Sequence, residues 1–336
     1  AIGNYALQDL NAGGHGYHVV IGYNAGKEMT TAIRSVLIGA AAGDALTTGS
    51  YNVAIGYSAL STEDTGNRNI AIGYDTLRNL NYDGDGNNVA IGFNAGTAVT
   101  TGTVNTLIGS EAGDALTIGN SNVAIGYNSL GAETQGDRNV AIGKDALASQ
   151  NNTGGSVDTY NTAVGYGAGT SVTTATANTL LGGLAGDAIT TGFGNVAIGY
   201  NALSAEDTGG TNVAIGHAAL QVQDAGANAY NIAIGYDTGK AVTTGTQNTI
   251  IGGDAGKALT TGSNNTAIGY EALSVEDTGS RNTAIGWRAL KKLNYDGLGH
   301  NIGIGYEAGA ESTTGRYNIL IGNFSGDAIT TGSENV

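Results

Sequence analysis

Carboxylates are the side chains of this chain best suited to chemistry, and one short run of them could bind a metal ion. Asp83 and Asp85 lie in the sequence Tyr-Asp-Gly-Asp-Gly, where their oxygens and nearby backbone carbonyls could hold Ca²⁺. The run lacks the third spaced carboxylate and the distal glutamate of a helix-flanked calcium loop. In the related run 294–299, Leu298 stands in place of Asp85. We therefore expect solvated turns here, with calcium binding as the alternative.

Adjacent Glu-Asp pairs recur at equivalent places, at residues 63–64, 206–207 and 276–277. Paired carboxylates can hydrolyse glycosidic bonds, but the two must flank the same bond. Neighbouring residues of an extended chain point in opposite directions, so the members of each pair should be separated. We expect turns rather than a catalytic site, and a polysaccharide-degrading tailspike segment is the enzymatic alternative.

Other catalytic signatures are missing from the sequence. The chain has no cysteine, and its four histidines fall in different sequence contexts. Two glycine-containing runs, 22–27 and 252–257, superficially suggest a phosphate-binding loop, but their glycine spacing is one residue short and no Ser or Thr follows the lysine. We expect no enzyme activity and no cofactor other than the calcium already considered.

Aromatic side chains form a regular row that could bind a surface. The row occupies the position after a recurring glycine, and its main members are Tyr57, Tyr74, Tyr127, Tyr200, Tyr270 and Trp287. In every fourth repeat the position is small or polar instead, at Ala40, Ser110, Gly183, Gly253 and Asn323. The rings could stack on sugars of a host or cell surface, or they could pack on one another. Their regularity favours packing over a local site.

The element that positions all of these residues is a short repeat. An Ile-Gly pair, usually within Asn-Val-Ala-Ile-Gly-Tyr, returns nineteen times from Gly3 to Gly322, with Val164 and Leu181 replacing the isoleucine. Most intervals are 17 residues, and every fourth is longer. The chain is therefore a stack of coils grouped in four-coil units of about 70 residues.

Composition restricts the classes of function. The chain of 336 residues has 58 Gly, no Pro, no Cys and a formal net charge of -15. Nucleic acids and anionic membranes need a basic face, so neither is an expected partner. No run of 18 apolar residues occurs, so this segment should not insert into a membrane. Because both ends lie within a repeat, we expect residues 1–336 to be one repetitive domain from a longer chain.

The repeat length predicts an all-β fold, a parallel β-solenoid or β-roll of about 18 coils. Each coil has one β-prone run, such as residues 52–56, and a weaker second run, such as 44–49, so we expect two strands and two turns per coil. Coils stacked at strand spacing, roughly 4.8 Å, would give a rod about 86 Å long. The absence of proline fits strands that donate to both neighbours.

Repeated positions should form ladders along such a stack. We expect the isoleucine before the glycine to be the buried row, and stacked asparagines such as Asn52 and Asn69 to hydrogen-bond from coil to coil. The residue before the isoleucine, Ala or Leu, should then face away and need a cover. On this interpretation Ile108→Asp disrupts stacking, whereas Leu107→Asp disrupts an interface between chains.

A thin coil with an apolar outer stripe predicts an oligomer, because the stripe would otherwise be exposed. The alternative is a monomeric solenoid that binds ice or calcium. Thr pairs such as Thr47 with Thr48 suggest the ice-binding reading, but adjacent strand residues point apart and a flat threonine array would need them two apart.

The repeats also resemble known families. The runs Asn-Val-Ala-Ile-Gly-Tyr-Asn-Ala-Leu and Ala-Gly-Asp-Ala-Leu-Thr-Thr-Gly are similar to repeats of phage tail-fibre shafts and large bacterial surface fibres. The Asn-Val-Ala-Ile-Gly core is similar to the head repeats of trimeric, YadA-like autotransporter adhesins, whose repeat is shorter. The resemblance covers the whole chain and implies a homotrimer of β-rolls, on a cell surface or virion, that reaches and binds other surfaces. We therefore expect the structural shaft of an extracellular fibre.

Overall fold

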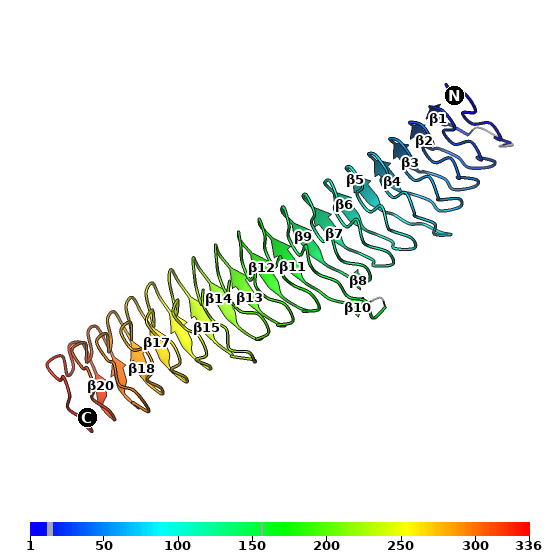
Figure 1. The fold of residues 1–336 in the computed structure, drawn as a ribbon. Helices are drawn as coiled ribbons and strands as arrows, with labels where there is room; N and C mark the ends of the chain where they lie inside the picture. Colours follow the sequence, from blue (N-terminus) through cyan, green and yellow to red (C-terminus); the bar gives the residue numbers. More distant parts are fainter. Residues whose placement is uncertain (12–15, 156) are drawn as a thin grey trace. The chain divides into compact units, whose positions relative to one another are not determined.

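The computed structural model describes residues 1–11, 16–155 and 157–336. The chain forms two compact units, Ala1–Gly167 and Ala168–Val336. Each is a stack of coils, and among the described residues each holds nine strands of three residues, one per coil (Figure 1).

The strands of the first unit are β1 (Val19–Ile21), β2 (Val36–Ile38), β3 (Val53–Ile55), β4 (Ile70–Ile72), β5 (Val89–Ile91), β6 (Thr106–Ile108), β7 (Val123–Ile125), β9 (Val140–Ile142) and β11 (Thr162–Val164). The strands of the second unit are β12 (Thr179–Leu181), β13 (Val196–Ile198), β14 (Val213–Ile215), β15 (Ile232–Ile234), β16 (Thr249–Ile251), β17 (Thr266–Ile268), β18 (Thr283–Ile285), β19 (Ile302–Ile304) and β20 (Ile319–Ile321). Two shorter strands, β8 (Gly136–Asp137) and β10 (Val157–Asp158), pair separately.

Within each unit every strand pairs in parallel with the strand of the next coil, without a shift in register. Val53 lies beside Ile70, for example, and Ile55 lies beside Ile72. The register keeps each repeat position in one column, so the ladders expected from the sequence exist. The predicted fold class, an all-β parallel β-solenoid with a spacing of about 17 residues, is confirmed. Within the described ranges, no helix is long and apolar enough to cross a membrane.

The prediction of two strands per coil is wrong. The second run, residues 44–49, forms turns and bends. Its backbone still bonds to the next coil, because the Thr47 N–H and hydroxyl both donate to the carbonyl of Asp64, at 2.8 and 3.1 Å. A threonine hydroxyl thus supplies a bond between coils where the strand geometry is lost.

The prediction of which row is buried is also wrong. In every three-residue strand the middle residue is buried and the outer two are half-buried or exposed, so Leu107 is fully buried whereas Ile108 is not. The Ala and Leu row is the core, and the isoleucine row lies on the outer face. The alternation of inward and outward side chains along the strand was correctly predicted, but the wrong residues were assigned to the interior.

The size of the coil interior explains this phase. Most coils place Ala at the middle position, and the larger residue Leu37 fits because two neighbouring coils present glycines to it. A Cβ on Gly26 would lie 2.7 Å from Leu37 Cδ1, and a Cβ on Gly43 would lie 3.0 Å from Leu37 Cδ2. At the middle strand position the interior therefore holds a small side chain in most coils and a larger one, such as Leu37, where glycines face it, and a continuous column of isoleucines would overfill it.

The asparagine ladder is confirmed, and it is buried from Asn52 to Asn318. The Asn69 N–H donates to Asn52 Oδ1 at 2.9 Å, and Asn52 Nδ2 donates to the carbonyl of Gly66 at 2.8 Å. At the start of the stack His18 substitutes for asparagine, since its Nδ1 accepts from the Ser35 N–H at 3.2 Å. Each such side chain satisfies backbone groups of its own coil or the next one, which lets polar residues lie inside.

Candidate functional site

The aromatic row forms stacked groups on the outside of the coils. Tyr57 and Tyr74 have ring centroids 5.1 Å apart, and Tyr74 and Phe93 have centroids 5.5 Å apart, with interplanar angles of 15° and 18°. About half of each ring is exposed. Because each ring lies on the next, the ring faces that meet within a group are covered.

The same three-membered group recurs in the second unit. Tyr200, His217 and Tyr236 stack with centroid separations of 5.8 and 5.1 Å. Tyr270, Trp287 and Tyr306 stack at 6.4 and 4.7 Å. We call each position in this column a rung. The sequence reasoning did not include His217, although its place after the recurring glycine marks it as a rung.

One rung of the first unit is a cation. Lys144 lies between Tyr127 and Tyr166, with its Nζ 5.8 and 5.7 Å from the two ring centroids. In the second unit the Arg288 guanidinium lies 4.0 Å from the Trp287 ring centroid. An ammonium between two rings preserves the column through cation–π attraction, so the group of three persists without a third ring.

The weak calcium candidates each have a protein partner. The Thr65 hydroxyl donates to Asp83 Oδ1 at 2.7 Å, and Asp85 forms an ion pair with Arg68. Both aspartates are exposed. Calcium binding at these residues stays the alternative to the predicted solvated turns.

Among the described residues, one acidic cluster has carboxylate oxygens close enough to share a metal ion. It comprises Glu206, Asp207 and Asp224, with one oxygen of each within 4.8 Å of the others. Glu206 already accepts from the Gly209 N–H at 2.7 Å and from Gln223 Nε2 at 3.0 Å. Its carboxylate therefore has a structural role that accounts for its burial.

Buried glutamates are the feature that sequence reasoning missed. Glu63, Glu133, Glu206 and Glu276 are fully buried, one in each four-coil unit, in the coil before a long one. Glu63 Oε1 accepts from the Gly66 N–H at 2.6 Å, and its Oε2 accepts from the Tyr82 N–H of the long coil at 3.1 Å. The glutamate thus fastens the extra residues of the long coil to the coil before it. The recurrence of a glutamate once in each four-coil unit was the signal in the sequence that could have identified them.

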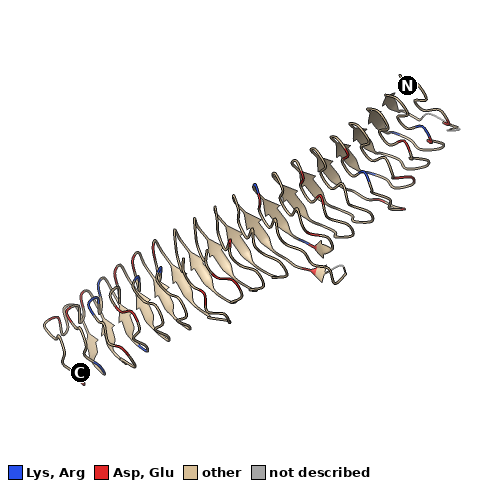
Figure 2. Ribbon diagram, in the orientation of Figure 1, with Lys and Arg blue, Asp and Glu red and all other residues tan. Residues whose placement is uncertain are grey.

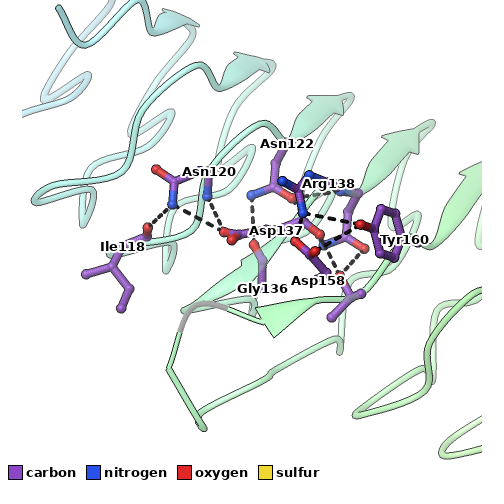
Figure 3. Close-up of polar contacts among 10 residues, drawn as sticks. Ile118, Asn120, Asn122, Gly136, Asp137, Arg138, Asp158 and Tyr160 are labelled. Carbon is purple, nitrogen blue, oxygen red and sulfur yellow. Dashed lines mark hydrogen bonds and ion pairs between the residues drawn. The ribbon is translucent and has the colours of Figure 1, made fainter.

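The long coil that follows Glu133 is the longest of the long coils. Its strand β10 pairs with β8 of the coil before it. Asp137 Oδ1 accepts from the Asn120 N–H at 2.6 Å, while Arg138 forms an ion pair with Asp158 and lies over Tyr160 (Figure 3). These contacts connect successive coils through the buried Asp137 and the exposed Arg138 and Asp158. We interpret them as structural contacts along the edge of the coils rather than as a binding site.

The buried glutamates predict a pH dependence of stability. Burial raises the pKa of Glu63, Glu206 and Glu276, so the folded chain favours their protonated forms. This stabilisation is complete below the unfolded pKa, about 4.3, and is lost as pH rises through the higher folded values. We expect the melting temperature to be higher at pH 5 than at pH 7, measured by circular dichroism at constant ionic strength.

The control for this prediction is Glu276→Gln, which removes one titrating group while keeping the side-chain shape. It should lower the melting temperature at pH 5 and flatten the dependence between pH 5 and 7. A melting temperature that rises from pH 5 to pH 7 in the unmodified chain would contradict the raised pKa of the buried glutamates.

The threonine pairs divide between two roles. The first member donates its hydroxyl to a carbonyl of the next coil, as Thr47 does to Asp64 and Thr190 does to Asp207, both at 3.1 Å. The second member, such as Thr48 or Thr191, is exposed. Only one threonine of each pair is therefore available to order water.

No protein-family model, curated protein or solved structure matches the chain.

Proposed function

We propose that this chain is the structural shaft of an extracellular fibre, on a cell surface or a virion, and that it works as a homotrimer. Its work would be to extend and display adhesive or receptor-binding parts. The proposal draws on the repeat resemblance and on the outer face of the sheet. A monomeric ice- or calcium-binding solenoid and a polysaccharide-degrading spike are the alternatives from other classes.

The observation that supports the proposal is an uncharged apolar face on both units. The three-residue strands contain no charged residue, and the acidic and basic side chains lie on the turns around them (Figure 2). The outer strand residues are Val, Ile, Thr or Leu, and they are half-buried to exposed throughout. Such a face is an expected site of association.

A second copy is the partner that matches this face best. The face repeats at every coil, so a partner that covers it must present matching side chains at the same spacing. Another copy of the chain has the same side chains at the same spacing, and in a symmetric assembly the face of every copy is covered in the same way. The sequence predicted that the Ala and Leu row would form the interface, but this row lies inside the coil. We therefore propose the Ile row as the interface.

The proposal predicts that charges on the outer strand face will dissociate the oligomer. We expect the double variant Ile91→Asp and Ile125→Asp to sediment as a single chain, because two aspartates per chain would be buried against like charges. The matched control, Thr48→Asp with Thr101→Asp, adds the same charge to exposed turns and should keep the oligomer. Equal sedimentation of the two variants would refute the interface.

A further inference from the structure

One peptide group of the second unit makes no hydrogen bond, although the chain is held on both sides of it. It joins Asp296 to Gly297 in a long coil, and neither its carbonyl nor its N–H has a partner among the described residues. Before it, the Tyr295 N–H donates to the buried Glu276 at 3.2 Å. After it, the carbonyl of Gly297 accepts from the Ser280 N–H at 2.8 Å. The peptide group between these two points can therefore rotate without breaking a hydrogen bond.

This freedom has a chemical consequence where glycine follows aspartate. The glycine nitrogen can attack the aspartate Cγ, because glycine has no side chain to hinder the close approach. The sequence has three Asp-Gly pairs, at residues 83–84, 85–86 and 296–297. All three aspartates are exposed to water. Sequence and exposure therefore do not distinguish the three pairs.

The glycine N–H groups distinguish them. The Gly84 N–H donates to the carbonyl of Tyr82 at 2.7 Å, and the Gly86 N–H donates to the carbonyl of Asn67 at 3.0 Å. The N–H of Gly297 has no such bond in the described structure, and Gly297 has φ 145°, whereas the φ of Gly84 is not positive. Two of the three nitrogens must break a hydrogen bond before they react, and Gly297 need not.

A hydroxyl group from the coil before also activates the carboxyl group of Asp296. The Thr278 hydroxyl donates to Asp296 Oδ1 at 2.7 Å. Negative charge develops on this oxygen when a nucleophile adds to Cγ, so the hydroxyl stabilises the transition state. Thr65 donates to Asp83 Oδ1 in the same way, also at 2.7 Å. The activated carboxyl is common to the two pairs, and the free glycine nitrogen belongs to Asp296-Gly297.

We propose that Asp296-Gly297 is a site of spontaneous backbone modification, where Asp296 becomes isoaspartate through a cyclic succinimide. The Gly297 nitrogen bonds to Cγ of the protonated carboxyl group, the bond from Cγ to Oδ2 breaks, and the hydroxyl leaves as water with the proton of the nitrogen. Water then opens the ring at the main-chain carbonyl of Asp296, which leaves the chain running through Cβ and Cγ. Water is the one co-reactant. This inference goes beyond the shaft function and does not depend on it.

The product has one more backbone atom between two points that are held. The net charge does not change, but the chain from Tyr295 to Leu298 becomes longer. Leu298 pairs with Ser280 of the coil before, and the Ser280 N–H donates to the carbonyl of Gly297. The modification should therefore weaken the contact between these two coils at Ser280.

The first test ages the unmodified chain at neutral pH and measures isoaspartate at each pair by peptide mass spectrometry, with fragmentation that separates the two isomers. We expect Asp296 to react about fivefold faster than Asp83, since Gly84 must first break one hydrogen bond. In urea that unfolds the chain the two rates should be equal, because both pairs lie in Tyr-Asp-Gly. Equal rates in the folded chain, or a difference that persists in urea, would overturn the proposal.

The second test follows the structural consequence by hydrogen exchange. In the aged chain the Ser280 amide should lose protection, and the Asn67 amide, which bonds to the carbonyl of Gly84 at 2.8 Å, should lose less. The matched variant Asp296→Glu keeps the charge but requires a six-membered ring, which forms far more slowly. Its Ser280 amide should stay protected on ageing. Equal loss of protection in the variant and the unmodified chain, or no loss in either, would also overturn the proposal.

Discussion

Leu107→Asp should unfold the coils around residue 107. Leu107 is fully buried, and its side chain packs against the glycines of two neighbouring coils. The substitution removes a large apolar group and places an ionisable one in an interior with no partner for it. We expect a loss of more than about 5 kcal/mol, measured as the change in unfolding free energy in urea.

Ile108→Asp is the matched control for this prediction. Its side chain lies on the outer face, which the proposed trimer covers, so the substitution should weaken association between chains. In the separated chain the carboxylate reaches water, so the coil itself should lose far less stability. This order is the reverse of the one expected from the sequence. Unfolding by Ile108→Asp but not by Leu107→Asp would mean that Ile108, and not Leu107, lies inside the coil, which would contradict this structure.

Gly56→Ala should have a comparable effect through the backbone. Gly56 has φ 140°, a conformation that L-residues rarely adopt, and a Cβ there would overlap the carbonyl oxygen of Gly73 in the next coil. The strain and the overlap act together, and the overlapping atom belongs to backbone that is itself hydrogen-bonded. We expect a loss of at least about 4 kcal/mol in unfolding free energy.

Gly253→Ala tests whether the effect comes from the position rather than from the loss of a glycine. Its Cβ would meet only the Tyr270 ring, at 3.6 Å, and its φ is not left-handed. Stability should therefore change little or rise by a few tenths of a kcal/mol, as for glycines in a compatible conformation. Equal losses in the two variants, read from melting curves, would contradict the account of Gly56.

Features that depend on one repeat position could be predicted from the sequence. Stacked Asn52 and Asn69 indicated a ladder, because identical side chains at strand spacing lie close enough to hydrogen-bond from coil to coil. The fold class followed from the same periodicity.

Features that depend on the space between coils could not be predicted in the same way. Isoleucine is larger and more apolar than alanine, so the sequence favoured Ile108 as the core. The small interior decides otherwise, and the pairing of Leu107 with Gly96 and Gly113 becomes informative only when the coils are stacked. Glu63 resembled a solvated turn residue because its backbone partners lie three and nineteen residues away.

The mass of the purified chain in solution tests the central proposal most directly. Light scattering at moderate salt, with and without a calcium chelator, should give about three times the chain mass of 33.4 kDa under both conditions. A mass of one chain would contradict the trimeric shaft and favour a free solenoid. A trimer that dissociated on chelation would instead make the acidic turns metal sites, against the structural role described for Glu206.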